Sequence, residues 1–169
     1  MQTNKLTIMT KKNIEYLKKR QMQTNKLTIL IIDDSEIVRK QLMEMLCEIK
    51  GVEWVKAAEC AEEGLELALT LKPMLVILDL SMPYTSGVEI IPKLKQISPS
   101  PILIVLTNYS DSIYQEHCIN LGADYFLDKS LDFDKILDIT KNLPKAIKLQ
   151  TKSQVIKLQI KPQCLQNFS

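Results

Sequence analysis

Short apolar runs alternate with amphipathic stretches along the middle of this chain. The runs are rich in β-branched residues and end at breakers, which is typical of strands buried on both faces of a parallel sheet. We predict strands at residues 28–33, 52–57, 74–79, 102–107 and 123–127. Apolar residues at helical spacing predict helices over residues 36–49, 61–71, 88–97, 111–121 and 132–143. Five strand–helix repeats predict an α/β domain, with a doubly wound five-stranded parallel sheet and helices on both faces.

Most of the predicted strands end at a polar residue. Asp33 and Asp34 close the first run, Asp79 closes the third, Thr107 closes the fourth, and Lys129 follows the fifth. The carboxyl ends of parallel strands meet at one edge of the sheet, where open α/β folds bind their ligands. We therefore expect three acids, a hydroxyl and an ammonium group to converge on one site.

The residue types at this edge suit phosphoryl chemistry. A carboxylate can accept a phosphoryl group, and the transfer needs mainly positioning and charge neutralisation. Three carboxylates held together repel one another, and Mg²⁺, a hard cation with oxygen ligands, would relieve the repulsion. Each residue alone has an ordinary structural explanation, since Asp34 could cap the next helix, Thr107 could be a plain strand-end hydroxyl and Lys129 could be solvated. Their grouping at one edge favours a functional site.

Four sequence motifs occur in order at these strand ends: the pair of adjacent aspartates, DLSMPYTSGVE, LTN and GADYFLDK. With these motifs, residues 25–143 resemble the receiver domain of two-component response regulators, of the chemotaxis-regulator-like type. The resemblance implies a flavodoxin-like sheet with the strand order 2-1-3-4-5. It also implies signalling through phosphorylation of an aspartate.

The resemblance assigns Asp79 as the phosphoacceptor. Asp34 would ligate Mg²⁺ directly, and Asp33 would help to hold the metal and its waters. The carboxylate of Asp79 and the backbone carbonyl of Ser81 would supply further metal ligands. Lys129 would pair with a phosphoryl oxygen, or with Asp79 before phosphorylation.

In this family a switch couples the acceptor to the surface. By resemblance, Thr107 would hydrogen-bond the phosphoryl group and draw its loop inward, and Phe126 occupies the switch-aromatic position. Ser130 follows Lys129 where the family commonly has proline, so we expect a looser loop there. Tyr109 stands where the family controls the approach of water, and its bulk predicts slow autodephosphorylation. A phosphoryl half-life of only seconds, measured on the isolated protein with Mg²⁺, would contradict that prediction.

Charge is segregated along the chain, although the formal net charge is only +2. Residues 1–21 carry +5, residues 22–145 carry −7 and residues 146–169 carry +4. We therefore expect a basic and disordered N-terminal extension, residues 1–24, ahead of the receiver domain, and a basic C-terminal tail, residues 144–169. The sequence MQTNKLTI occurs twice, at the start of the extension and again at the start of the domain.

Cysteine usage and hydropathy indicate the compartment. The four cysteines lack metal-ligand spacing, which favours reduced thiols. No stretch approaches the ~20 apolar residues that cross a membrane, and the start of the chain lacks the apolar core of a signal peptide. We expect a cytoplasmic protein with no membrane insertion. In the tail, the alternation over residues 155–160 could form an added edge strand or a hairpin, or the tail could stay a cationic extension.

We expect a stand-alone phosphoacceptor that receives its phosphoryl group from a sensor histidine kinase or a histidine phosphotransfer protein. About two dozen residues follow Leu143, too few for a helix-turn-helix output domain with its own core. Output would come through a downstream protein that docks on the face of helix 111–121, strand 123–127 and helix 132–143, or through a phosphorylation-dependent dimer. The chain would catalyse only its own phosphorylation and dephosphorylation and is otherwise not expected to be an enzyme.

Two other functions stay open as alternatives. The basic tails could bind DNA phosphates and make the chain a transcriptional regulator. The acidic body opposes this and no recognition helix is evident, so we expect no nucleic-acid partner. An Asp-nucleophile phosphatase would need a second acid two residues after Asp79, where this chain has Ser81.

Overall fold

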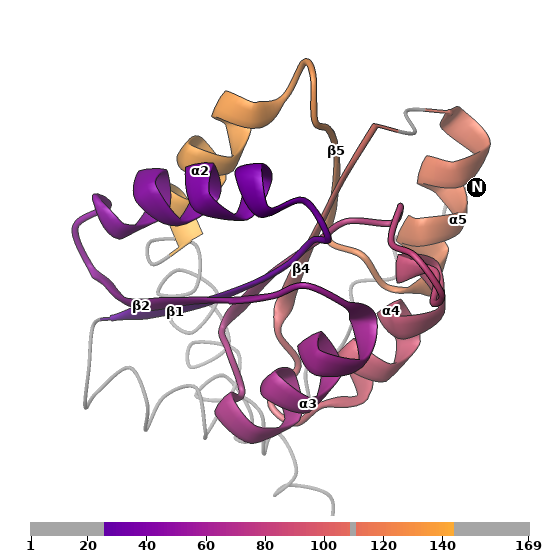
Figure 1. Cartoon of the computed structure of the whole chain (residues 1–169), viewed down its shortest axis with the longest axis horizontal. Helices are drawn as coiled ribbons and strands as arrows, with labels where there is room; N and C mark the ends of the chain where they lie inside the picture. Colours follow the sequence, from indigo (N-terminus) through magenta and orange to yellow (C-terminus); the bar gives the residue numbers. More distant parts are fainter. Residues whose placement is uncertain (1–25, 109–110, 144–169) are drawn as a thin grey trace, which may run out of the picture.

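The computed structural model describes residues 26–108 and 111–143. They form a five-stranded parallel sheet in the order β2-β1-β3-β4-β5 (Figure 1). The strands are β1 (Leu27–Ile32), β2 (Val52–Ala58), β3 (Leu75–Leu78), β4 (Ile102–Thr107) and β5 (Tyr125–Asp128). The helices are α2 (Glu36–Cys47), α3 (Ala61–Leu71), α4 (Gly87–Gln96) and α5 (Ser112–Leu121), followed by a helix over residues 133–143. The predicted fold class and strand order are confirmed.

Helices cover both faces of the sheet. The helix α2 and the helix over residues 133–143 lie on one face, and α3, α4 and α5 lie on the other (Figure 1). Alternating side chains of β1 supply both layers: Ile29 and Ile31 join the first core, and Leu30 and Ile32 join the second. The three inner strands are almost wholly buried, which explains why they are continuous apolar runs in the sequence.

The strands β1 and β3 end one residue earlier than the sequence predicts. The predicted strands included Asp33 and Asp79, but both acids come just after their strands. Each carboxylate accepts a hydrogen bond from the backbone N–H two residues later, at Ser35 for Asp33 (2.9 Å) and at Ser81 for Asp79 (3.1 Å). These local turns take the chain out of the strand direction at the point where the acids stand.

Three sequence predictions concern residues outside the described part of the chain. They are the disordered N-terminal extension, the structure of the basic tail with its alternating segment, and the shielding by Tyr109. Among the described residues, no helix has the length and apolar character needed to cross a bilayer.

Gly87, the first residue of α4, packs against the backbone that carries Asp79. A Cβ atom at this position would collide with the carbonyl oxygen of Asp79 and lie 2.7 Å from the Cα atom of Leu80. We expect Gly87→Ala to lower the unfolding free energy by about 3 kcal/mol, because a backbone cannot move aside locally. Urea unfolding of the full chain measures this cost.

The matched control for that substitution is Gly64→Ala. A Cβ atom there would lie 2.6 Å from Cδ1 and 2.8 Å from Cγ1 and Cγ2 of the buried Ile32, all of them side-chain atoms, which can shift more easily than backbone. We expect a cost of about 1 kcal/mol. Equal costs for the two variants would contradict the interpretation that Gly87 is needed for a backbone approach.

Candidate functional site

Three carboxylates gather at the carboxyl edge of the sheet, where β1 and β3 are neighbours. Asp33 and Asp34 follow β1, and Asp79 follows β3. One carboxylate oxygen of each residue lies within 4.8 Å of the others. Asp33 and Asp79 are each 2% exposed, whereas Asp34 is exposed. The cluster expected from the strand ends is therefore present, and solvent reaches it on the side of Asp34.

The ammonium group of Lys129 pairs with the two buried acids. Its Nζ lies 2.7 Å from Oδ2 of Asp79 and 2.8 Å from Oδ2 of Asp33. Burial raises the pKa of Asp33, although the hydrogen bond and charge of Lys129 act in the opposite direction. Burial alone would lower the pKa of Lys129, but the hydrogen bonds and charges of the two acids outweigh it, so that pKa lies above its ordinary value. Lys129 therefore stays charged and opposes the repulsion between the carboxylates.

A turn centred on Asp128 places Lys129. The carboxylate oxygen Oδ1 of Asp128 accepts hydrogen bonds from the backbone N–H groups of Ser130 (2.7 Å) and Leu131 (3.1 Å). The backbone N–H of Lys129 donates to the carbonyl of Thr107 (2.9 Å). Serine keeps an N–H that proline would lack, and Asp128 binds it, so the loop that we expect to be looser at Ser130 has a local hydrogen bond of its own. Sequence reasoning did not identify Asp128. The signal was available, because an aspartate side chain commonly accepts a hydrogen bond from the backbone N–H two residues later in a turn.

The other predicted site residues surround this centre. Thr107 ends β4 and is fully buried. Ser81 is exposed, and its backbone N–H donates to Oδ1 of Asp79. Phe126 in β5 is half-buried and packs against the core on the side of α3, α4 and α5. Phe126 therefore belongs to the core layer beside the site, not to the acidic cluster itself.

Arg39 in α2 supports the first acid from the helix side. Its Nη1 donates to the backbone carbonyl of Asp33 (2.7 Å), and its Nη2 lies 3.7 Å from a carboxylate oxygen of Glu59. Sequence reasoning missed Arg39 because the contact depends on the packing of α2 beside β1 and β2. No spacing rule within a helix indicates it.

The donor set suits a hard divalent metal ion. All the donors in the cluster are carboxylate oxygens, which are ligands for Mg²⁺ and Ca²⁺ and less suited to soft metals. The exposed position of Asp34 leaves room for the water ligands that such ions keep. The described residues therefore fit a metal ion at this edge of the sheet.

Comparison of the sequence with known families identifies one matching family model. A model described as the response regulator receiver domain matches residues 29–141. The chain is similar to the response regulator GacA of Pseudomonas aeruginosa, with 28% identity over 102 residues that cover 60% of this chain and 48% of GacA. This chain spans about half the length of the curated relatives it matches.

Solved structures have a similar arrangement of elements. A response regulator protein from Burkholderia pseudomallei, crystallised with a phosphorylated aspartic acid, a calcium ion and citrate, superposes with a TM-score of 0.61 and 27% identity, covering 72% of this chain and 71% of that one. The REC domain of the response regulator AraT from Geobacillus stearothermophilus superposes with a TM-score of 0.63 and 29% identity, covering 73% of this chain and 97% of that one.

Proposed function

The chain belongs to the family of response regulator receiver domains of two-component systems, and on this premise we propose that Asp79 accepts a phosphoryl group from a phosphohistidine. The donor is a sensor histidine kinase or a histidine phosphotransfer protein in the cytoplasm. The position of Asp79 carries the proposal: its buried carboxylate lies beside two other acids and is hydrogen-bonded to Lys129 at 2.7 Å. An incoming phosphoryl group could meet a metal ion and an ammonium group together at this point.

Both oxygens of the acceptor carboxylate are held before the reaction. Oδ1 of Asp79 accepts from the N–H of Ser81, and Oδ2 accepts from Lys129. In the transfer, a carboxylate oxygen forms a bond to phosphorus while the bond between phosphorus and the donor imidazole nitrogen breaks, and the imidazole keeps the electron pair. Lys129 can then move from the carboxylate to a phosphoryl oxygen and neutralise its charge. The chain thereby catalyses only its own phosphorylation and later dephosphorylation.

Mg²⁺ is the metal that we propose for this site. Asp33, Asp34, Asp79 and the backbone carbonyl of Ser81 would hold it, and the bound ion would neutralise charge between the acids and the phosphoryl oxygens. Asp33 is fixed for this role by hydrogen bonds to its carboxylate and to its carbonyl. Asp34, which is exposed, would complete the site from the solvent side.

Mg²⁺ is expected to raise the melting temperature of the full chain, and Asp34→Asn is expected to remove most of that increase. At about one hundred times its Kd, an ion that binds only the folded state adds about 2.7 kcal/mol to stability, which corresponds to a shift of several degrees. Thermal unfolding in EDTA and in Mg²⁺ measures the effect. Glu36→Gln, which alters an exposed acid outside the cluster, should keep the full shift. A full shift in the Asp34 variant would contradict the assignment.

Phosphorylation would act on the surface through Thr107 and Phe126. Thr107 ends the strand next to β5, and its carbonyl is bonded to the backbone of Lys129. A new hydrogen bond from the threonine hydroxyl to a phosphoryl oxygen would draw the loop after β4 toward Asp79. Phe126 pairs in register with Val105 of β4, so movement of the loop after β4 would change the conformation of the Phe126 side chain. Phosphorylation would thereby shift the equilibrium between two conformations of the domain.

The face formed by α5, β5 and the helix over residues 133–143 would receive the downstream partner or, after phosphorylation, a second copy of the chain. Within α5, Cys118 is the single buried side chain. The large apolar side chains of Ile113, Tyr114 and Ile119 are exposed on this helix. Exposed apolar side chains grouped on one element favour a protein-binding surface.

Incubation of the full chain with acetyl phosphate and Mg²⁺ tests the proposed function. Intact-mass spectrometry should show the addition of one phosphoryl group, and an autophosphorylated histidine kinase should label the chain in the same way. A folded protein that gains no phosphoryl group from either donor would overturn the proposal. Turnover of a small phosphomonoester would support the phosphatase alternative instead.

A further inference from the structure

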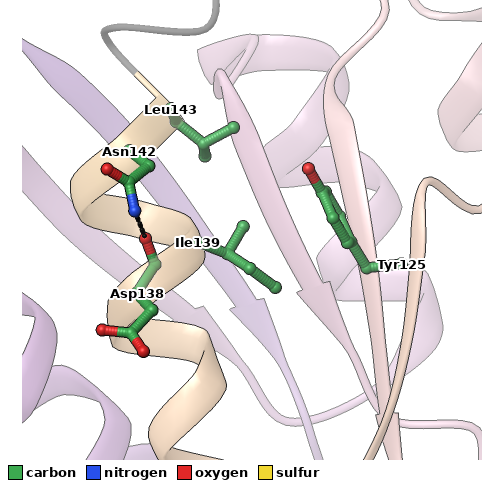
Figure 2. Close-up of a pocket in the computed structure, with 5 residues that line it drawn as sticks. All are labelled: Tyr125, Asp138, Ile139, Asn142 and Leu143. Carbon is green, nitrogen blue, oxygen red and sulfur yellow. Dashed lines mark hydrogen bonds between the residues drawn. The ribbon is translucent and has the colours of Figure 1, made fainter.

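A pocket lies between the start of β5 and the end of the helix over residues 133–143. Its volume is about 250 Å³, and it is lined by Tyr125, Asp138, Ile139, Asn142 and Leu143. Figure 2 shows the ring of Tyr125 on the strand across from the side chains of Ile139 and Leu143 on the helix, while the carboxylate of Asp138 points away from Tyr125. The volume is below the ~300–1,000 Å³ of typical small-molecule sites. Side chains of a peptide suit this space better than a cofactor does.

The pocket stands at a free edge of the sheet. Among the described residues, β5 pairs only with β4 and is the last strand in the order. At the far end of β5, Asp128 already uses its N–H and its carbonyl in hydrogen bonds with Asp132. The outer backbone groups nearer Tyr125 can therefore pair with a further extended segment. Tyr125, the first residue of β5, keeps 39% of its surface exposed at this edge. The site is also separate from the acidic cluster, because Lys129 follows the opposite end of the same strand.

We propose that residues 155–160 of the same chain bind in this pocket. The segment has the sequence VIKLQI, and in an extended conformation alternate residues share one face. Ile156, Leu158 and Ile160 would then form an apolar face that matches the tyrosine ring and the aliphatic walls of the pocket. The proposal does not depend on phosphorylation of the acidic site.

Charge favours the same occupant. Residues 146–169 contain four lysines and no acid, whereas residues 22–145 carry −7. Asp138 is among the residues that line the pocket and is exposed, so its negative charge favours a basic segment at little cost in desolvation. Attraction between a basic tail and an acidic body directs the segment toward the domain before any specific contact forms.

The position of the pocket brings the segment within reach. Leu143 lines the pocket and is also the last described residue before the tail. Residues 144–154 form the connection. A random-coil chain of that length would have a mean span of roughly 18 Å, and its fully extended limit is about 40 Å. Such a tether gives an effective concentration in the millimolar range, so that an intrinsically weak contact becomes well populated.

Backbone hydrogen exchange on the full chain tests this proposal. Leu158→Asp puts a charge on the apolar face of the segment and leaves the described domain unchanged, so the variant keeps its fold, which circular dichroism verifies. We expect amides in β5 and in the last two turns of the helix over residues 133–143 to exchange about tenfold faster than in the wild type. That factor corresponds to a local Kd of about 0.1 mM against a millimolar effective concentration.

Gln159→Asp is the matched control, because it adds the same charge on the opposite face of the extended segment. It should exchange as the wild type does. Equal exchange in wild type and Leu158→Asp would overturn the proposal, and so would equal acceleration in both variants, since charge alone would then explain the effect. Protection that rises with protein concentration over a roughly hundredfold range would also overturn it, because the occupant would then be the tail of a second copy.

Discussion

Asparagine in place of Asp79 is expected to leave a folded chain that takes up no phosphoryl group. The amide nitrogen of asparagine cannot act as the nucleophilic oxygen, and its remaining oxygen no longer carries the charge that attacks phosphorus. That oxygen can accept from Ser81 or from Lys129 but not from both, because the amide NH₂ group then faces the other donor. Lys129 keeps its pair with Asp33 at 2.8 Å. Intact-mass spectrometry after acetyl phosphate and Mg²⁺ should therefore show only the unmodified mass.

Stability provides the second measurement for this variant. The substitution removes one of two buried like charges that share one ammonium group, so we expect the unfolding free energy in EDTA to be unchanged or higher. Asp111→Asn is the matched control, since Asp111 caps α5 through the N–H of Ile113 at 2.8 Å and asparagine caps equally well. The control should accept the phosphoryl group normally. If Asp79→Asn were phosphorylated to the same extent as the wild type, the acceptor would be another residue.

The sheet could be predicted from the sequence because its inner strands are buried on both faces. A strand such as β1, whose six residues are all buried, must be apolar throughout, and this pattern differs from that of an amphipathic helix. The predicted ends of the helices and strands agree less well with the structure. The helix α2 ends at Cys47, two residues before the predicted end, and a turn in which Val52 donates to the carbonyl of Ile49 leads into β2. Such turns depend on local hydrogen bonds that the apolar pattern does not contain.

The principal acids and Lys129 could also be predicted, because a polar residue that follows a buried strand must emerge at the ligand-binding edge. The residues that hold these side chains in place could not be predicted. Arg39 reaches the backbone of Asp33 from a neighbouring helix, and Gly87 is needed only because the chain passes close to the carbonyl of Asp79. These contacts span only six and eight residues, but they depend on how the chain leaves its strand and packs against the next helix, and that geometry leaves no pattern in a single sequence.

Methionine in place of Lys129 is expected to produce the largest loss of stability among the substitutions considered. The side chains of Lys129, Asp33 and Asp79 are 11%, 3% and 2% exposed, so the two acids would be left buried without their cation. Removal of one partner from such a buried group costs about 3–5 kcal/mol. Denaturant unfolding in EDTA at neutral pH measures the loss. Lys135→Met, which breaks a pair with Asp132 in which the lysine side chain is 65% exposed, should cost less than about 1 kcal/mol.

The dependence of stability on pH and on Mg²⁺ distinguishes an uncompensated charge from a packing defect in Lys129→Met. Burial already raises the pKa of Asp33 in the folded chain, and loss of the ammonium group would raise that pKa further. A carboxyl whose folded-state pKa is raised binds its proton more tightly when folded, so its contribution to stability is complete below the unfolded pKa and disappears as pH rises through the folded one. The loss of unfolding free energy in Lys129→Met should therefore shrink as the pH is lowered.

Mg²⁺ should also restore more stability to this variant than to the wild type, because the ion takes the place of the missing cation. A deficit that is the same at every pH and in Mg²⁺ would show that the lysine contributes by packing alone.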